Sequence, residues 1–195
     1  MRAPITYVPK HILNADAAFA ALRDELQWVK HDDAPRHEYY CNDVPKPYTY
    51  GRGNGVRTYE PQPYHPMILE IRKSVEAFAN SVFEVCFLNR YLHQRDQLGW
   101  HADDSPEMDD ARPIAIVSLG VEREIWFREK PVSTPPAPYD AYLNIVENIK
   151  LGHGSLCLMA AGMQDEWQHR IPKASFQCGE RISLTFRGYV EAPPV

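Results

Sequence analysis

The chain lacks the features of a membrane protein or a secreted protein. Among its 195 residues, no apolar run approaches the roughly 20 residues that a membrane-spanning helix needs. The first residues (MRAPITYVPKHILNADAAF) do not show the positive segment followed by an apolar segment that a signal peptide has. We therefore expect a cytoplasmic protein with no membrane partner.

Clustered cysteines and an excess of positive charge are also missing. The four cysteines (Cys41, Cys86, Cys157 and Cys178) are scattered and never spaced Cys-x-x-Cys, which argues against a zinc ribbon or a disulfide framework. The net charge of −5 argues against a protein that binds nucleic acid through bulk positive charge. A local basic groove remains compatible with this charge.

The length fits one compact domain over residues 1–195, which we expect to act as a monomer. Apolar residues at helical spacing predict a helix over residues 14–29, with Asn14 as its N-cap. A second helix is predicted to begin at His65-Pro66, since proline suits a first helical turn. The apolar positions behind these predictions are Phe19, Leu22, Leu26 and Val29, then Met67, Ile71, Val75, Phe78 and Val82.

The rest of the chain reads as strands and loops. Residues 31–64 are rich in Tyr, Arg, Pro and Gly, which predicts hairpins and loops on the surface. From residue 83 the pattern predicts about eight short strands with turns between them. Residues 131–140 form a proline-rich loop in this interpretation. Two helices followed by many strands indicate an α+β protein built on a β-sandwich or barrel.

The first chemical signal is His101-Ala102-Asp103. Residues two apart on a strand project to the same face, so this pair can reach one metal ion. His169 is the best candidate for a third ligand, and two histidines with one carboxylate hold Fe(II) with three positions open. A lone His-x-Asp usually has no function. The histidines expected to be surface or hydrogen-bonded residues are His11, His31, His37, His65, His93 and His153.

The second signal is the strand RISLTFR. Arg181, Ser183, Thr185 and Arg187 share one face of it, opposite three apolar residues. Two arginines on an interior strand need anions to pair with, and the guanidinium group binds a carboxylate through two hydrogen bonds. A dicarboxylate that chelates the metal at one end and meets arginine at the other satisfies both signals. The alternative is a solvated strand face paired with surface acids.

These residues, taken together, resemble a known family. NRYLHQRDQLGWHADD, PIAIVSLG, LGHGSLCLMAAGMQDEWQHRIP and RISLTFR resemble the AlkB family of Fe(II)/2-oxoglutarate-dependent dioxygenases, in the same order and with similar spacing. The resemblance covers residues 83–190 and implies a catalytic double-stranded β-helix, or jelly roll, there. It is looser over residues 1–82, where it implies N-terminal helices and a nucleotide-recognition lid at PRHEYYCND and PYTYGRG.

The resemblance also implies roles for individual residues. Fe(II) is expected on His101, Asp103 and His169. The cosubstrate 2-oxoglutarate is expected to contact Asn89, Tyr91, Arg181, Thr185 and Arg187, with one arginine pairing with its distal carboxylate. Substrate contacts are expected from Tyr48, Thr49, Tyr50 and Asp104, and phosphate contacts from Arg36, Arg52 and Arg57.

The implied activity is oxidative demethylation of N-alkylated bases such as 1-methyladenine and 3-methylcytosine. The partner would be alkylated nucleic acid, with DNA favoured over RNA, and the reaction would use O2 and release formaldehyde, succinate and CO2. One alternative is a 2-oxoglutarate oxygenase acting on a protein or a small molecule, which the negative charge mildly favours. A cupin-like module with a structural metal is another. A zinc hydrolase is a third, but it has no use for the two arginines.

Overall fold

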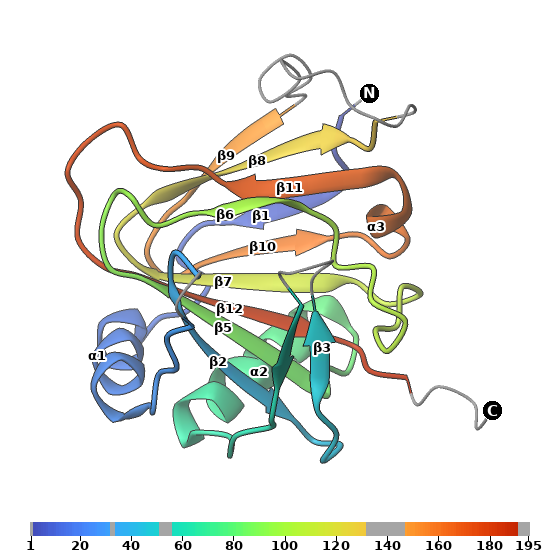
Figure 1. Ribbon diagram of the computed structural model, residues 1–195, viewed down its shortest axis with the longest axis horizontal. Coiled ribbons are helices and arrows are strands. Elements are labelled where there is room, and N and C mark those ends of the chain that lie inside the picture. The colour runs from blue at the N-terminus through green and yellow to red at the C-terminus, as the bar shows by residue number, and fades with distance from the viewer. Residues whose placement is uncertain (1, 32–33, 51–55, 132–146, 191–195) are drawn as a thin grey trace.

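A computed structural model describes residues 2–31, 34–50, 56–131 and 147–190. Within these residues two antiparallel β-sheets pack face to face (Figure 1). The larger sheet runs in the order β1 (Ile5–Val8), β10 (Ser155–Met159), β7 (Ile114–Gly120), β12 (Arg181–Arg187), β5 (Val85–Tyr91) and β2 (His37–Asn42). The smaller sheet runs in the order β6 (Leu98–His101), β11 (Trp167–Ile171), β8 (Arg123–Glu129) and β9 (Glu147–Leu151). This arrangement agrees with the predicted α+β jelly roll.

Three helices and a two-stranded pair complete the fold over the described residues. Helices α1 (Ala15–Glu25) and α2 (Pro66–Ala79) pack against the outer face of the larger sheet (Figure 1). A short helix, α3 (Met163–Glu166), leads directly into β11. Strands β3 (Tyr48–Tyr50) and β4 (Arg57–Tyr59) pair with each other beside β2 and β5. No helix among the described residues is long and apolar enough to span a membrane.

Strand β12 separates two regions of the interior. Its residues Ile182, Leu184 and Phe186 pack into the core beneath the two helices. The alternate residues face the space between the two sheets: Arg181, Ser183, Thr185 and Arg187. All seven residues of the strand are buried. The predicted division of this strand into an apolar and a polar face is therefore confirmed.

The first helix is shorter than the sequence predicts. It ends at Glu25, and Leu26 takes an extended conformation. The chain then turns so that Val29 forms two backbone hydrogen bonds with Glu38, at 2.8 and 2.9 Å, which a continued helix would prevent. Asn14 precedes the helix but makes no capping bond with its side chain, whose Nδ2 donates to Glu70 Oε1 at 3.1 Å.

The second helix begins as predicted and turns most of the predicted face inward. His65 Nδ1 accepts the backbone N–H of Met67 at 3.1 Å, which caps the helix before Pro66. Ile71 and Val75 are buried as expected, together with Ile68. Phe78, in the last turn of the helix, is exposed and packs edge-on against His11. Val82 is exposed beyond the helix, which ends at Ala79 before the left-handed Asn80 redirects the chain.

The prediction of surface hairpins over residues 31–64 is wrong for β2. This strand lies in the larger sheet beside β5, and five of its six residues are buried. The sequence HEYYCN does not indicate a buried strand, because it has tyrosines and polar residues where a buried strand usually has aliphatic ones. The pairing of β3 with β4 does match the prediction. The proline-rich stretch lies almost wholly outside the described residues.

Candidate metal and cosubstrate site

Two histidines and an aspartate meet between the sheets. Strands β6 and β11 are neighbours, and their register places His169 opposite His101. His101 Nε2 lies 3.8 Å from Asp103 Oδ1, and His169 Nε2 lies 3.7 Å from Asp103 Oδ2. One ligand atom from each residue lies within 4.8 Å of the other two. The structure therefore brings together the three side chains that the sequence singled out.

The protonation of both imidazoles suits metal binding. His101 Nδ1 lies 2.9 Å from the carbonyl oxygen of Gly99, which can only accept, so Nδ1 carries the proton. The lone pair of Nε2, 3.8 Å from Asp103 Oδ1, is then available to a metal ion. Burial lowers the pKa of both His101 and His169, that of His169 to about 3. Both rings are neutral at pH 7, as coordination requires.

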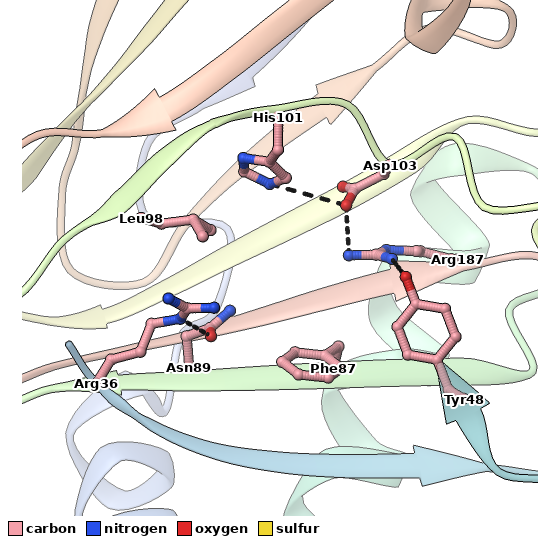
Figure 2. Close-up of a pocket in the computed structure, with 8 residues that line it drawn as sticks. All are labelled: Arg36, Tyr48, Phe87, Asn89, Leu98, His101, Asp103 and Arg187. Carbon is pink, nitrogen blue, oxygen red and sulfur yellow. Dashed lines mark hydrogen bonds and ion pairs between the residues drawn. The ribbon is translucent and has the colours of Figure 1, made fainter. Parts of the chain in front are cut away.

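Asp103 is held as a carboxylate. Its burial opposes ionisation, but the guanidinium of Arg187 beside it holds its pKa below the usual value. Arg187 Nη2 lies 2.6 Å from Asp103 Oδ1 (Figure 2). The backbone N–H of Asp103 donates to the buried side chain of Gln164 at 2.9 Å. Two neutral imidazoles and one fixed carboxylate are the donor set that Fe(II) accepts with open positions.

Arg181 lines the same space between the sheets but is not paired with an acidic side chain among the described residues. Its side chain is completely buried, and Nε donates to Ser118 Oγ at 2.7 Å. Its two terminal nitrogens have no hydrogen-bond partner among the described residues. Burial lowers the pKa of Arg181 to about 10, which still leaves it charged at pH 7. A buried cation without an anion is costly, so this position suits a carboxylate from a ligand.

One cavity joins Arg181 to the three candidate metal ligands. It lies between the two sheets and receives side chains from β5, β6, β7, β8, β11 and β12. Its lining includes all five predicted cosubstrate residues: Asn89, Tyr91, Arg181, Thr185 and Arg187. The structure also separates the two arginines, since Arg187 pairs with Asp103 and Arg181 does not.

An adjoining pocket opens beside His101 and Asp103. Figure 2 shows Arg36 and Asn89 on one side of it and Arg187 and Tyr48 on the other. Arg36 Nε donates to Asn89 Oδ1 at 2.5 Å. The expectation that Arg36 faces phosphates is therefore wrong, because its side chain is buried in the pocket wall. Arg52 lies outside the described residues, and Arg57 is half-buried in β4.

The predicted substrate contacts are distributed unevenly. Tyr48 is buried in an aromatic cluster and lines the pocket, with its hydroxyl 2.9 Å from Ser105 Oγ. Thr49 is exposed and contacts Thr58 instead of the pocket. The side chain of Tyr50 lies outside the described residues. Asp104 pairs with Lys130 at 2.9 Å on the surface and is not among the residues that line the pocket.

Sequence reasoning missed several residues of the site. Phe87 lies two and four residues before Asn89 and Tyr91, so strand alternation would have placed it on the same face. Leu98 lies three residues before His101, a spacing that strand alternation would place on the opposite face. The register shift between the two residues brings it to the same pocket, and the sequence does not show that shift. Glu38, Ser118 and Gln164 have no signal in the sequence, because only the folded chain brings them to the site.

Comparisons with known proteins agree with this geometry. The family model described as the 2OG-Fe(II) oxygenase superfamily matches residues 14–187. The alpha-ketoglutarate-dependent dioxygenase alkB homolog 3 of Bos taurus is 34% identical over 184 residues, covering 89% of this chain and 61% of that protein. The DNA oxidative demethylase ALKBH2 of Homo sapiens is 30% identical over 184 residues, covering 89% of this chain and 68% of that protein.

A solved structure of OsALKBH1 shares the fold. Its TM-score is 0.60 at 15% sequence identity, and the match covers 97% of this chain and 98% of that one. The chain is shorter than many of its relatives. It spans between 46% and 61% of the length of the alkB homolog 3 proteins that it matches.

Proposed function

Because the chain belongs to the 2OG-Fe(II) oxygenase superfamily and, within it, to the AlkB family, we propose that it is a dioxygenase that demethylates N-alkylated bases in nucleic acid. One observation carries the proposal. A buried pair of imidazoles with a carboxylate shares a cavity with a fully buried arginine whose terminal nitrogens have no partner among the described residues. That arrangement fits a metal ion and a dicarboxylate side by side.

The chain's own residues would hold both groups. His101, Asp103 and His169 are the proposed ligands of Fe(II), which together with 2-oxoglutarate and O2 supplies the oxidation of the methyl group. Arg181 is proposed to pair with the distal carboxylate of 2-oxoglutarate, because its terminal nitrogens are the buried donors that need an acceptor. Arg187 keeps Asp103 charged and oriented for the metal.

The remaining cosubstrate contacts follow from the lining of the cavity. Asn89, Tyr91 and Thr185 all face it, and each offers a hydrogen-bonding group. The hydroxyl of Tyr91 is buried without a hydrogen-bond partner among the described residues, so a ligand oxygen there would satisfy it. Both sheets contribute side chains around the cavity, and keeping water out of it would protect the oxidation from side reactions.

The adjoining pocket is the proposed place for the base. Tyr48 and Phe87 present aromatic surface next to His101 and Asp103, which suits a flat ring. A base in a strand reaches such a pocket only when it is turned out of the stack. The relatives named DNA oxidative demethylase favour DNA as the substrate of this chain. Asp104 would have to leave Lys130 before it could contact the base.

An oligonucleotide panel tests the proposal. Strands carrying 1-methyladenine or 3-methylcytosine are incubated with Fe(II), 2-oxoglutarate and O2, and formaldehyde is measured. We expect release from the methylated strands that requires both iron and 2-oxoglutarate, and none from unmethylated strands. If 2-oxoglutarate is consumed but no methylated strand yields formaldehyde, the substrate is a protein or a small molecule instead.

A further inference from the structure

A buried carboxylate lies behind the wall of the proposed base pocket. Glu38 on β2 has a completely buried side chain, and Arg36 Nη2 lies 2.7 Å from its Oε1. The hydroxyl of Tyr59 donates to Glu38 Oε2 at 2.9 Å, and His31 Nε2 lies 4.0 Å from the same oxygen. Glu38 does not line the pocket, whereas Arg36 does.

The two contacts of Arg36 fix its guanidinium group. Its Nε donates to Asn89 Oδ1, and Nη2 pairs with Glu38. A planar guanidinium held at two of its nitrogens has little freedom to turn, so the pocket always meets the same face of the group. Its positive charge is balanced from behind by Glu38.

The second guanidinium of the pocket is balanced in the same manner. Arg187 pairs with Asp103 at 2.6 Å, and both side chains are buried. Each arginine that lines the pocket therefore has its own buried carboxylate. Burying an ion pair is costly and often adds nothing to stability, so these pairs suggest a role in what the pocket accepts.

Methylated bases differ in charge. A methyl group on N1 of adenine or N3 of cytosine occupies a ring nitrogen that has no hydrogen to lose, so the base becomes a cation. A methyl group on N3 of thymine or N1 of guanine replaces a hydrogen, so the base stays neutral. An uncompensated guanidinium in the pocket wall would repel the first class and leave the second almost unaffected.

We propose that Glu38, acting through Arg36, is a specificity-determining residue that lets the pocket accept cationic methylated bases. This inference depends on the proposed function, because it concerns the charge of the base. Glu38 is a positioning and balancing residue, since it contacts neither the cavity nor the candidate metal ligands. Without its negative charge, the pocket would carry the unbalanced charge of Arg36.

The test compares two substrates on each variant. Matched oligonucleotides carry 3-methylcytosine or 3-methylthymine at one position, and kcat/KM is measured for each from formaldehyde release. Glu38→Gln keeps the size of the side chain and an oxygen for Tyr59 but removes the charge. We expect the ratio of kcat/KM for 3-methylcytosine over 3-methylthymine to fall by roughly tenfold or more. Two unit charges about 10 Å apart give a change of this size at an effective dielectric constant of about 20.

Two further variants separate charge from structure. The double variant Arg36→Gln with Glu38→Gln removes both charges, and we expect it to recover most of the ratio. Glu180→Gln removes a carboxylate from another ion pair, that with Arg90 at 2.8 Å, outside the pocket lining. We expect this control to leave the ratio unchanged. Because each ratio is taken on one sample, the fraction of folded protein cancels.

The outcomes are distinct. If Glu38→Gln lowers kcat/KM for both substrates by the same factor, or leaves their ratio unchanged, Glu38 does not set the preference and the inference is overturned. The same holds if the double variant keeps the lowered ratio. If the unaltered protein releases formaldehyde from no methylated oligonucleotide, the proposed function fails, and this inference fails with it.

Discussion

Arg181 is the residue whose environment is hardest to explain without a ligand. Replacing it with methionine removes a buried charge whose terminal nitrogens have no partner among the described residues. We expect Arg181→Met to raise the KM for 2-oxoglutarate by about 10²-fold, since charge-assisted bonds to a carboxylate are worth about 1.5–3 kcal/mol or more. The ligand-free variant should be as stable as the unaltered protein or more stable. The dependence of rate on 2-oxoglutarate and urea unfolding measure the two effects.

A different result would be informative at this position. If Arg181→Met leaves the KM for 2-oxoglutarate unchanged, the distal carboxylate is bound elsewhere. If the ligand-free variant is several kcal/mol less stable, Arg181 serves the fold, and the argument from its lack of a partner is wrong.

Among single residues, the sequence identified those whose spacing along a strand predicts a shared face. Arg181 and Arg187 were found because side chains six apart share a strand face. The same reasoning selected His101 with Asp103, although β6 ends at His101 and Asp103 lies in the loop that follows. The sequence could not assign the two arginines to different tasks. That difference follows from Asp103, which a loop carries to one end of β12. Glu38 was not found, because nothing in HEYYCN marks a buried acid.

Among the elements, the end of β12 is tied to the start of β5 by a group of ion pairs. Arg112 pairs with Glu84 at 3.0 Å and with Asp109 at 2.7 Å, and it donates to the carbonyl oxygen of Tyr189. Glu84 also accepts the backbone N–H of Tyr189 at 2.9 Å. Burial opposes ionisation of Glu84, but these hydrogen bonds hold its pKa below the usual 4.5.

Glu84 therefore predicts a pH dependence of stability. A carboxyl whose pKa is lowered by folding stabilises the protein above its unfolded pKa, and this contribution is lost as the pH falls through the folded value. We expect Glu84→Gln to lower the free energy of unfolding by about 1 kcal/mol at pH 7, since the group is partly exposed. The difference should shrink below pH 4.5. Urea unfolding of both proteins from pH 7 to pH 3 measures it, and a difference that grows on acidification would contradict the assignment.

The elements themselves were predictable where apolar periodicity was strong. Strands β5, β7, β8, β10 and β12 and the start of α2 followed from the sequence. The failures occurred where tertiary contacts override local preference. The pairing of Val29 with Glu38 ends α1 early, and β2 is buried by its neighbours although tyrosines fill it.

For the whole molecule, the shared cavity predicts that the two ligands bind cooperatively. Arg181 and the three candidate metal ligands line one space. A dicarboxylate that spans it can contact Arg181 at one end, and it contacts a metal at the other end only when the metal is bound. We expect 2-oxoglutarate to raise the Tm more in the presence of Mn(II) than in its absence. The unaltered protein and His169→Ala are compared by thermal unfolding. Equal shifts with and without Mn(II) would show that the two ligands bind independently.

The overall architecture was predictable because many short strands after two helices leave few ways to bury their apolar faces. The jelly roll itself came from the resemblance of residues 83–190 to a family. Spacing alone indicated only a sandwich or barrel, since strand order depends on long-range pairing that local patterns do not encode.

Both faces of β12 are buried, which limits the substitutions that this strand can accept. We expect a substitution that loosens Ile182 or Leu184 also to move Arg181 and Arg187 on the opposite face, so core packing and the geometry of the proposed site depend on the same strand. We expect changes of substrate preference to arise instead in the β3–β4 pair, where Thr49 and Thr58 are exposed and lie outside the strand pairs of β12.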